Sequence, residues 1–346
     1  MDLSHNARLT IDTAALVANW QAFARAGGNA ACGAAVKADG YGLGARAVAD
    51  ALVAAGCRDL FVAHWHEVTA LETLPAGVRI AVLHGVGPDE MALARGSRAV
   101  PVLVTPAQVA AWAPTGRPCD VMVDTGMNRL GLSPAEARSG ILDDLVLHTL
   151  HSHLACAETP AHPMNERQRA AFADVVTSFP EQRHALANSA GIGLGSGYHF
   201  GLTRPGIGLY GGGAGPDNTP LTAVAGLSAR ILQLRDIAAG DHVGYGATFT
   251  APRAARLAIV ALGYADGYPR SLSNRGAALI AGVRCPAVGR VSMDLSAFDV
   301  SAAADHLAEG DFIDVEFDLA ITAAAAGRTE YELLTGLGAR YAKHYR

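Results

Sequence analysis

The stretch Ala34-Ala35-Val36-Lys37-Ala38-Asp39-Gly40-Tyr41-Gly42-Leu43-Gly44 joins a short apolar segment to a glycine-rich loop through a single lysine. We interpret residues 33–37 as a buried strand with Lys37 at its carboxyl end. A lysine amine on a rigid strand end can form a Schiff base with the carbonyl group of a cofactor or substrate. The alternative is a strand-end lysine that reaches solvent before a flexible loop, and the rest of the chain decides between the two.

Further apolar runs follow this segment, and helical patterns lie between them. The runs are near-continuous in Val, Ile, Leu and Ala, which is typical of strands buried on both faces of a parallel sheet. Eight strands alternating with helices favour a (β/α)8 barrel, with a doubly wound open sheet as the alternative. The strands expected after 33–37 are 59–63, 78–83, 99–104, 119–124, 145–153, 183–188 and 202–210.

The composition changes after position 210. Residues 211–220 hold three glycines followed by Ala-Gly-Pro-Asp-Asn-Thr-Pro, which is typical of a linker. A phosphate cradle is less favoured there, because no helix start follows. Short runs at 227–234, 256–261, 277–280, 287–293 and 312–317 then indicate a mostly β domain. We expect residues 11–215 to form the barrel and residues 1–10 with 221–346 to form the β domain, with a strand at 7–11 and a helix at 330–345.

Composition excludes several classes of protein. The 346 residues are 50% hydrophobic and 17% charged, which predicts a sizeable core. The net charge of -5 comes without a basic cluster, so we expect neither nucleic acid nor a membrane as a partner. We see no secretory signal, no apolar run that could span a membrane, and no metal-binding or disulfide spacing among the five cysteines. We therefore expect a cytoplasmic enzyme without a metal site.

Polar residues gather at the carboxyl ends of the expected strands, where a barrel places its chemistry. The hydroxyl of Ser189 and the close backbone approach at Gly206 predict a phosphate site, and Lys37 lies across the barrel mouth from it. This combination suits pyridoxal phosphate. Lys37, Arg129, His151, His153, Asn188 and Ser189 lie at or just after these ends, and Arg204 and Gly206 open the eighth strand.

Each of these residues also has a structural interpretation, and the alternatives stay open at this point. They are a surface ion pair for Arg129, a strand cap for Arg204, a helix N-cap for Asn188-Ser189, a core histidine for His151 or His153, and turn positions for the glycine-flanked Tyr245 and Tyr264.

Taken together, the motifs resemble those of bacterial alanine racemases, in that family's order and spacing. They are the lysine loop, Met127-Asn128-Arg129-Leu130-Gly131, His151-Ser152-His153, and residues 187–190, 204–211, 245–248, 263–267 and 289–294. The resemblance covers about residues 7–334 and is most specific at the lysine loop and at the pair Tyr-Gly-Ala-Thr and Gly-Tyr-Ala-Asp-Gly. It implies a barrel followed by a β domain, pyridoxal 5'-phosphate as cofactor, and a head-to-tail homodimer in which each barrel mouth is covered by the partner's β domain.

The resemblance also implies a role for each matching residue. Lys37 would hold the cofactor as an aldimine, and Arg204 would donate to its ring nitrogen. The other implied contacts are Tyr41, Asn188, Ser189, Gly206 and Ile207 with the phosphate, Arg129 with the cofactor's phenolic oxygen and the substrate carboxylate, and Tyr245, Tyr264 and Met293 arriving from the partner chain.

The implied reaction interconverts L-alanine and D-alanine with one base on each face, Lys37 and Tyr245, and supplies D-alanine for peptidoglycan. A free tyrosine has a pKa near 10, so we expect a cationic network through His153 and Arg204 to favour its phenolate. An arginine cannot accept the ring proton, so the ring stays a weak electron sink and side reactions are discouraged. We expect alanine to be the preferred substrate, because Tyr264 and Tyr268 would narrow the mouth of the active site. Serine should react slowly rather than not at all, because a pocket rejects one added hydroxyl group poorly.

The chain departs from the family at several positions. Met122 stands where many members carry a carbamylated lysine, so we hypothesise that Asn128 or a bound anion orients Arg129 instead. The other departures are Ser292 in place of a cysteine, His151 where a tyrosine is common, and Ala339 at the place of a late tyrosine, with Tyr341 two residues on.

Three rival functions remain. A decarboxylase of the same architecture would place a glutamate, rather than Arg204, on the ring nitrogen. A non-catalytic cofactor carrier would lack the β domain. A metal-dependent barrel hydrolase is suggested by His64-Trp65-His66, whose spacing on a strand can bind zinc, although the other strand ends offer no carboxylate-rich set.

Overall fold

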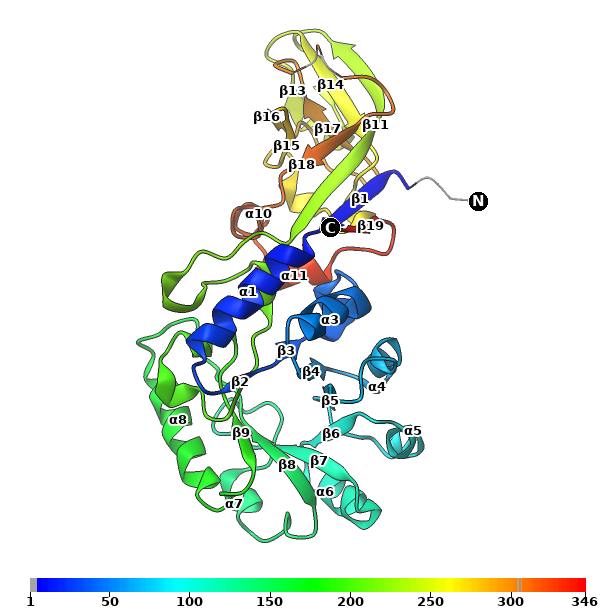
Figure 1. The fold of residues 1–346 in the computed structure, drawn as a ribbon. Helices are drawn as coiled ribbons and strands as arrows, with labels where there is room; N and C mark the ends of the chain where they lie inside the picture. The colour runs from blue at the N-terminus through cyan, green and yellow to red at the C-terminus, as the bar shows by residue number, and fades with distance from the viewer. Residues whose placement is uncertain (1–4, 304, 306) are drawn as a thin grey trace. The chain divides into compact units, whose positions relative to one another are not determined.

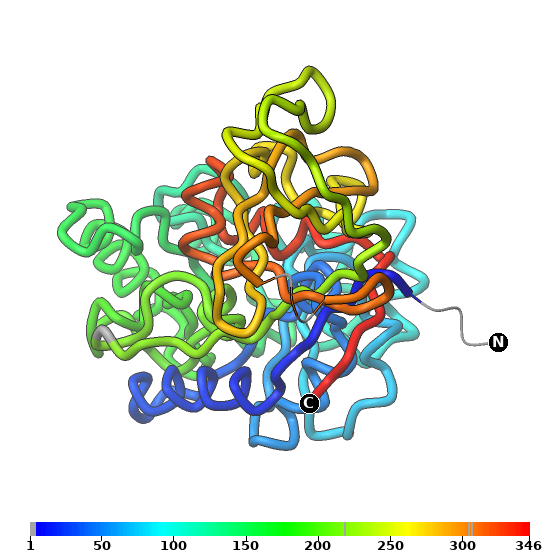
Figure 2. The backbone as a smooth tube through the Cα atoms, turned by 90° about the horizontal axis from the view of Figure 1, so that it is seen from above, coloured from blue at the N-terminus to red at the C-terminus, as the bar shows by residue number. Residues whose placement is uncertain are grey.

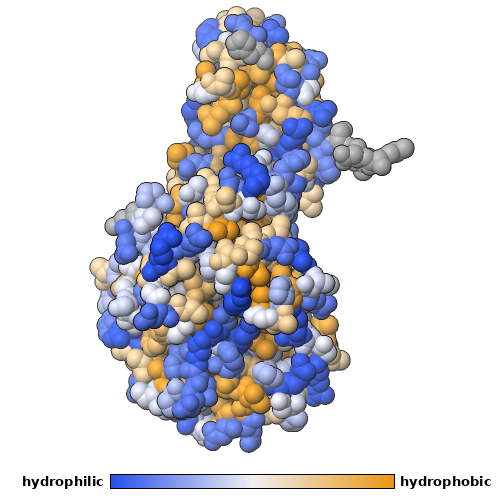
Figure 3. Space-filling view, viewed as in Figure 1, coloured by the Kyte–Doolittle hydropathy of each residue, from blue (hydrophilic) through white to orange (hydrophobic). Residues whose placement is uncertain are grey.

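The computed structural model describes residues 5–303, 305 and 307–346. The chain divides into two compact units, one of Leu16–Thr222 and the other of Met1–Ala15 with Ala223–Arg346. The face seen in Figure 3 mixes polar and apolar residues. Among the described residues, no helix combines the length and the apolar character needed to cross a membrane.

The unit of Leu16–Thr222 is a closed parallel barrel (Figure 1). Its strands pair in the order β2-β10-β9-β8-β7-β6-β5-β4-β3. β2 (Ala31–Cys32) and β3 (Ala34–Ala35) are two halves of one strand, so the described part of the chain closes eight strands into a ring. The expected barrel followed by a mostly β domain is thereby confirmed. The other strands are β4 (Asp59–Val62), β5 (Arg79–Val82), β6 (Val100–Leu103), β7 (Pro118–Met122), β8 (Val146–His151), β9 (Arg183–Ala185) and β10 (Leu202–Thr203).

Gly33 lies at the point where the ring closes. Its N–H donates to the Thr203 carbonyl at 2.9 Å, and the Ala35 N–H donates to the Pro205 carbonyl at 3.0 Å. A Cβ at position 33 would lie 2.8 Å from the Asp59 carbonyl oxygen. The close approach of backbone to backbone at this closure therefore requires glycine.

Helices alternate with the strands and cover the outside of the barrel (Figure 1). Several begin at the side chains that cap helices best. The Thr105 hydroxyl accepts the Gln108 N–H at 3.2 Å, and Ser133 forms a reciprocal capping box with Glu136. The helices are α1 (Thr13–Ala26), α3 (Ala45–Ala54), α4 (Trp65–Val68), α5 (Met91–Gly96), α6 (Pro106–Trp112), α7 (Pro134–Ala137), α8 (Pro163–Val176) and α9 (Ser189–Ile192).

Paired charges lie inside the barrel, where branched apolar side chains are the rule. Asp59 on β4 accepts from Arg183 on β9 at 2.9 Å. β4 and β9 are not neighbours in the sheet, so this pair reaches across the barrel. Arg79 on β5 lies 3.7 Å from Asp59 and also forms an ion pair with Asp120 on β7. Buried charges persist when they are paired in this way, and these four alternate in sign.

The second unit is a mostly β domain organised by one long strand, β11 (Ala225–Ile237). β11 pairs with β1 (Ala7–Ile11), β14 (Ala255–Val260) and β18 (Phe312–Val315), all antiparallel. The remaining elements are β12 (His242–Val243), β13 (Phe249–Thr250), β15 (Ala277–Ile280), β16 (Val283–Pro286), β17 (Ser296–Asp299), β19 (Ala342–Tyr345), α10 (Leu319–Ala326) and α11 (Glu330–Thr335).

Three expected elements differ in the structure. The run 202–210 is not one strand, because β10 ends at Thr203 and Ile207–Tyr210 forms a 3-10 helix after Pro205, which has no N–H to donate. The run 287–293 is a loop between β16 and β17. The expected helix 330–345 ends at Thr335, where glycines follow, and the chain then forms β19. Figure 2 shows this C-terminal segment running beside β1, with which it pairs in parallel.

We predict that Gly33→Ala lowers the free energy of unfolding by about 1–3 kcal/mol, because the new methyl group overpacks the ring closure. Urea denaturation measures the change. Gly96→Ala is the matched control, since a Cβ there meets no atom within 4 Å. Equal stability of the two variants would show that the closure tolerates a side chain.

Candidate active site

Lys37 begins α2 (Lys37–Tyr41), a turn with a left-handed backbone. Ala38, Asp39, Gly40 and Tyr41 have φ angles of 54°, 53°, 63° and 56°. L-residues avoid this region at a cost of about 1–2 kcal/mol each. The turn therefore persists only because its surroundings hold it, and such strain is typical of functional sites.

Glu67 on α4 is one of the groups that hold this turn. Its Oε1 accepts the N–H of Ala38 at 2.5 Å, and its Oε2 accepts the N–H groups of Ala63 and His64 at 2.6 Å and 3.0 Å. The carboxylate thus ties the residue after Lys37 to the end of β4. Glu67 is not among the site residues predicted from the sequence, although its position three residues after the helix N-cap His64 is a usable signal.

The surroundings of Lys37 favour a reactive amine. The side chain is half-buried, and burial lowers its pKa. The positive charges of Arg129 and Arg204 lower the pKa further, while Glu67 opposes them. A lower pKa leaves more of the amine unprotonated, which is the form that attacks a carbonyl carbon.

The segment after β10 is hydrogen-bonded to the first residue of α9. The Ser189 hydroxyl oxygen accepts the N–H groups of Gly206 and Gly208 at 2.8 Å and 3.2 Å. A Cβ at position 206 would lie 2.5 Å from the Tyr41 hydroxyl, so a side chain there would displace that hydroxyl. The structure therefore brings together three of the residues expected at a phosphate. Asn188 caps α9 with its side chain, as its structural interpretation required.

Tyr41 is held in place by a second tyrosine. Its ring stacks on Tyr210 with the ring centroids 4.5 Å apart, and the Tyr210 hydroxyl donates to the Ala35 carbonyl at 2.9 Å. Ile207, the fifth expected phosphate residue, is buried at the start of the 3-10 helix that ends at Tyr210. The strand that leads to Lys37 and the candidate phosphate cradle are thereby packed together.

Arg204 is buried and almost fully hydrogen-bonded. Its Nη1 bonds His151 Nδ1 and the Ala185 carbonyl at 2.5 Å and 3.5 Å, and its Nη2 bonds the Ser152 carbonyl and His153 Nδ1 at 2.5 Å and 3.5 Å. A guanidinium has five N–H donors, and these four contacts occupy the terminal ones. The Nε–H is the remaining donor, which suits an acceptor atom such as the nitrogen of a pyridine ring.

His153 is a neutral partner of Arg204. Burial lowers its pKa to about 3, and the positive charge of Arg204 acts in the same direction. Within the expected network of His153 and Arg204, the positive charge therefore lies on Arg204. Because His153 Nδ1 accepts from an arginine, the imidazole proton lies on Nε2, where it can be donated to a phenolate.

Arg129 lies in a loop built on Asp124. The Asp124 carboxylate accepts the N–H groups of Gly126 and Arg129, both at 2.8 Å. The Arg129 side chain is exposed, and within the described residues no hydrogen bond joins it to the side chain of Asn128. The structure thus lends no support to orientation by Asn128. Met122 is buried, and its thioether has no donor and is only a weak acceptor, so it does not replace a charged partner of Arg129.

Three expected site residues belong to the other unit and are exposed there. The exposed fractions are 73% for Tyr245, 44% for Tyr264 and 53% for Met293. Two loops hold the last two together, because the Tyr264 N–H donates to the Ser292 carbonyl and the Ala265 N–H to the Met293 carbonyl, each at 3.0 Å. Large exposed apolar side chains held on ordered loops are typical of a surface that a partner covers.

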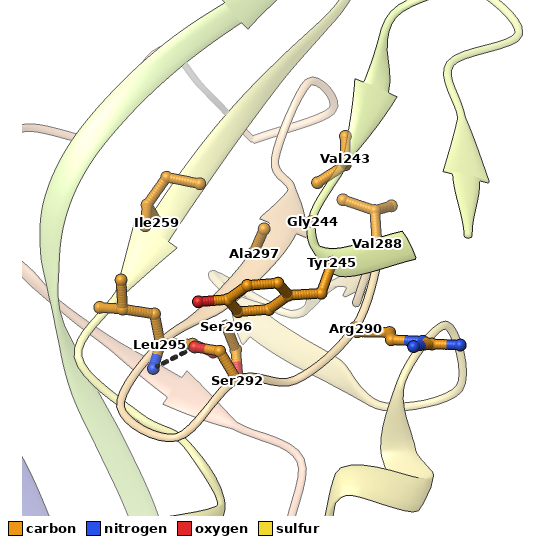
Figure 4. A pocket seen from close by; sticks show the side chains of 10 residues that line it. All are labelled: Val243, Gly244, Tyr245, Ile259, Val288, Arg290, Ser292, Leu295, Ser296 and Ala297. Carbon is orange, nitrogen blue, oxygen red and sulfur yellow. Dashed lines mark hydrogen bonds between the residues drawn. The ribbon is translucent and has the colours of Figure 1, made fainter. Parts of the chain in front are cut away.

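A pocket of about 330 Å³ opens beside Tyr245. In Figure 4 the Tyr245 ring extends across it with the hydroxyl on the side of Leu295, while the Arg290 side chain points the other way. Val243 and Val288, two further lining residues, are buried in the core of this unit. The loop that carries Tyr245 therefore rests on packed side chains.

Two expectations from the sequence are wrong. His64 and His66 do not share a strand, because β4 ends at Val62 and His64 is the N-cap of α4. In the described ranges no group of His, Cys, Asp or Glu is arranged to hold a metal ion, so the hydrolase alternative loses its site. Tyr268 is fully buried and cannot narrow a mouth, which leaves Tyr264 for that role.

We predict that His151 makes stability fall as the pH is lowered. Burial lowers its pKa from 6.5 to about 4, so below pH 6.5 the unfolded chain takes up a proton that the folded chain does not. The contribution is complete above that pH and is lost towards pH 4. Between pH 7 and pH 5 this linkage amounts to about 2 kcal/mol.

Urea denaturation of wild type and His151→Gln at pH 7 and pH 5 measures this loss of stability. The variant should lose less stability than wild type, and the exposed His5→Gln should behave as wild type. Parallel losses in wild type and His151→Gln would contradict the prediction.

The chain is similar to known proteins over nearly its whole length. Residues 11–214 match the family model "Alanine racemase, N-terminal domain", and residues 224–345 match "Alanine racemase, C-terminal domain". An alanine racemase of Rhodospirillum rubrum is 47% identical over 360 residues, covering 98% of this chain and 96% of the relative. A protein of Agrobacterium fabrum named "Alanine racemase, catabolic" is 44% identical, covering 97% and 91%.

Among solved structures, the alanine racemase from Bartonella henselae with covalently bound pyridoxal phosphate is 37% identical. It superposes with a TM-score of 0.91, covering 99% of this chain and 100% of that one. Both family models together span most of the chain, and the identities lie well above the level at which only a fold is shared. The chain therefore belongs to the alanine racemase family.

Proposed function

We propose that the protein interconverts L-alanine and D-alanine with pyridoxal 5'-phosphate as its cofactor. The observation that carries the proposal is the pairing of two groups in the barrel. One is Lys37, which burial and two arginines make more reactive. The other is Arg204, whose Nε–H has no partner among the described residues and suits a pyridine nitrogen.

The residues present fit the cofactor. Lys37 would hold its aldehyde carbon, and the Nε–H of Arg204 would meet its ring nitrogen. Tyr41, Ser189, Gly206 and Ile207 would bind the phosphate, with Asn188 acting through the helix cap. Arg129 would receive the phenolic oxygen and the substrate carboxylate. When bound, pyridoxal phosphate supplies an electron sink that acidifies the Cα–H of an attached amino acid.

Racemisation needs a proton removed from one face of a planar carbon and a proton delivered to the other. We propose that Lys37 Nζ serves one face and Tyr245 Oη the other. The neutral His153 donates from Nε2 to the Tyr245 oxygen, and the positive charge of Arg204 favours the phenolate. A guanidinium has no acceptor atom, so Arg204 would favour an unprotonated ring nitrogen, and the bound cofactor would then be a weaker electron sink.

We further propose a head-to-tail homodimer in which Tyr245, Tyr264 and Met293 serve the barrel of the partner chain. Their exposure supports this arrangement, because an aromatic base in water would gain neither orientation nor a shielded site. We place the enzyme in the cytoplasm, since its five cysteines are free thiols, and we assign its D-alanine to peptidoglycan on the family resemblance.

Rival functions fit less well. A decarboxylase of this architecture would need a carboxylate at the place of Arg204. A racemase of wider range, acting on serine as well as alanine, is the nearest alternative, because a pocket that accepts a methyl group rejects a hydroxymethyl group weakly. We expect L-alanine to be racemised faster than L-serine.

Loss of the Lys37 amine should abolish cofactor attachment. We expect borohydride reduction followed by peptide mapping to find the cofactor on Lys37 in wild type and on no residue in Lys37→Ala. Chiral analysis with L-alanine should show D-alanine formation in wild type alone. Carbon dioxide release in place of D-alanine would identify a decarboxylase and refute the racemase.

Two inactive variants should complement each other if the site is shared. A heterodimer of Lys37→Ala with Tyr245→Ala contains one intact site, and random pairing makes half of the dimers mixed, so co-expression should restore about one quarter of wild-type activity. The control pairs Lys37→Ala with the double variant Lys37→Ala/Tyr245→Ala, which leaves no intact site. Absence of restored activity in the first pair would exclude a shared site.

A further inference from the structure

Two buried residues next to Arg204 have no part in the function proposed above. Asp120 on β7 and His151 at the end of β8 are both 0% exposed. Asp120 Oδ2 lies 2.9 Å from His151 Nε2, and the other ring nitrogen of His151, Nδ1, lies 2.5 Å from Arg204 Nη1. The Asp120 carboxylate, the His151 imidazole and the Arg204 guanidinium are thus joined by two successive hydrogen bonds.

The carboxylate decides which nitrogen of His151 carries the proton. Burial alone would raise the pKa of Asp120, but Arg79 and the hydrogen bond from His151 hold it well below its usual range, so Asp120 is an anion. An anion can only accept, and therefore the proton of His151 lies on Nε2. Nδ1 is left with a lone pair, which is the group that an arginine N–H requires.

We propose that Asp120 and His151 are positioning residues for Arg204. Asp120 sets the tautomer of His151, and His151 then holds the guanidinium in the orientation that keeps its Nε–H for the nitrogen of the cofactor ring. The inference rests on the proposed function and deepens it, because it names the groups that aim the arginine at the ring.

Asp120 is itself fixed from the far side. Its Oδ1 accepts the Thr149 N–H at 3.0 Å and forms the ion pair with Arg79. Arg79 in turn lies 3.7 Å from Asp59, which is bound by Arg183. The alternating charges inside the barrel therefore anchor the carboxylate, and only its Oδ2 is directed at His151.

This anchoring makes Asp120→Asn a sharp test. The amide oxygen of the asparagine must stay at the Oδ1 position, because both groups that meet it there are donors. The amide NH2 group then faces His151 Nε2, which has to become the acceptor. The His151 proton then moves to Nδ1, so the Nδ1–H faces an N–H of Arg204 and the hydrogen bond between the two residues is lost. A wrong tautomer produced in this way is known to disable an enzyme whose geometry is otherwise intact.

The expected results have two spectroscopic readouts. NMR of isotopically labelled histidine, on the protein without cofactor, should show the His151 proton on Nε2 in wild type and on Nδ1 in Asp120→Asn. NMR of bound cofactor labelled at its ring nitrogen should show that signal displaced in Asp120→Asn. The dissociation constant for pyridoxal phosphate should rise roughly tenfold or more, as expected for loss of a hydrogen bond to a charged group.

Three controls separate positioning from folding. His151→Gln keeps one acceptor and one donor on a single amide, so it should retain the wild-type ring-nitrogen signal, whereas His151→Leu should not. Thr149→Val changes an equally buried residue of β8 and should leave that signal unchanged. Asp120→Asn should add no further displacement in a His151→Leu background, because its effect passes through His151.

An unchanged ring-nitrogen signal in Asp120→Asn, with wild type loaded on Lys37, overturns this inference and leaves the proposed function standing. An unchanged His151 tautomer overturns it as well. A wild-type protein that takes up no pyridoxal phosphate overturns the proposed function and the inference together.

Discussion

A buried cation that must be hydrogen-bonded on every terminal N–H is the constraint on which this active site depends. The terminal nitrogens of Arg204 donate to two carbonyl oxygens and to the imidazoles of His151, at the end of β8, and His153, two residues after it. The requirement fixes both imidazoles as acceptors at Nδ1 and leaves one donor of the guanidinium uncommitted. The chemistry of the barrel mouth therefore follows from how one charge is kept inside a protein.

The same site keeps a strained backbone. The left-handed turn after Lys37 is unfavourable for each L-residue in it, and Glu67 holds it by accepting the Ala38 N–H. The strain places the lysine on a rigid support at the end of a short strand instead of on a mobile loop. A base that must reach one face of a planar carbon gains from such a support, since misplacement by about 1 Å can cost a hundredfold in rate.

Much of this could be predicted from the sequence. The near-continuous apolar runs predicted all eight barrel strands, because strands covered on both faces need no polar alternation. The motifs at their ends pointed to Lys37 and Arg204. Errors arose where local pattern and context disagree: residues 342–345 lie in a strand because β1 offers an open edge, and residues 287–293 form a loop although their composition is apolar.

The barrel, the β domain and the residue types of the site follow from the amino-acid sequence alone, since periodicity and strand-end placement are local properties of the chain. The protonation states of those residues follow only from the folded structure. The neutral state of His153, the anionic state of Asp120 and the tautomer of His151 depend on burial and on partners far apart in sequence. Desolvation and charge pairing exist only once the strands have closed into a ring.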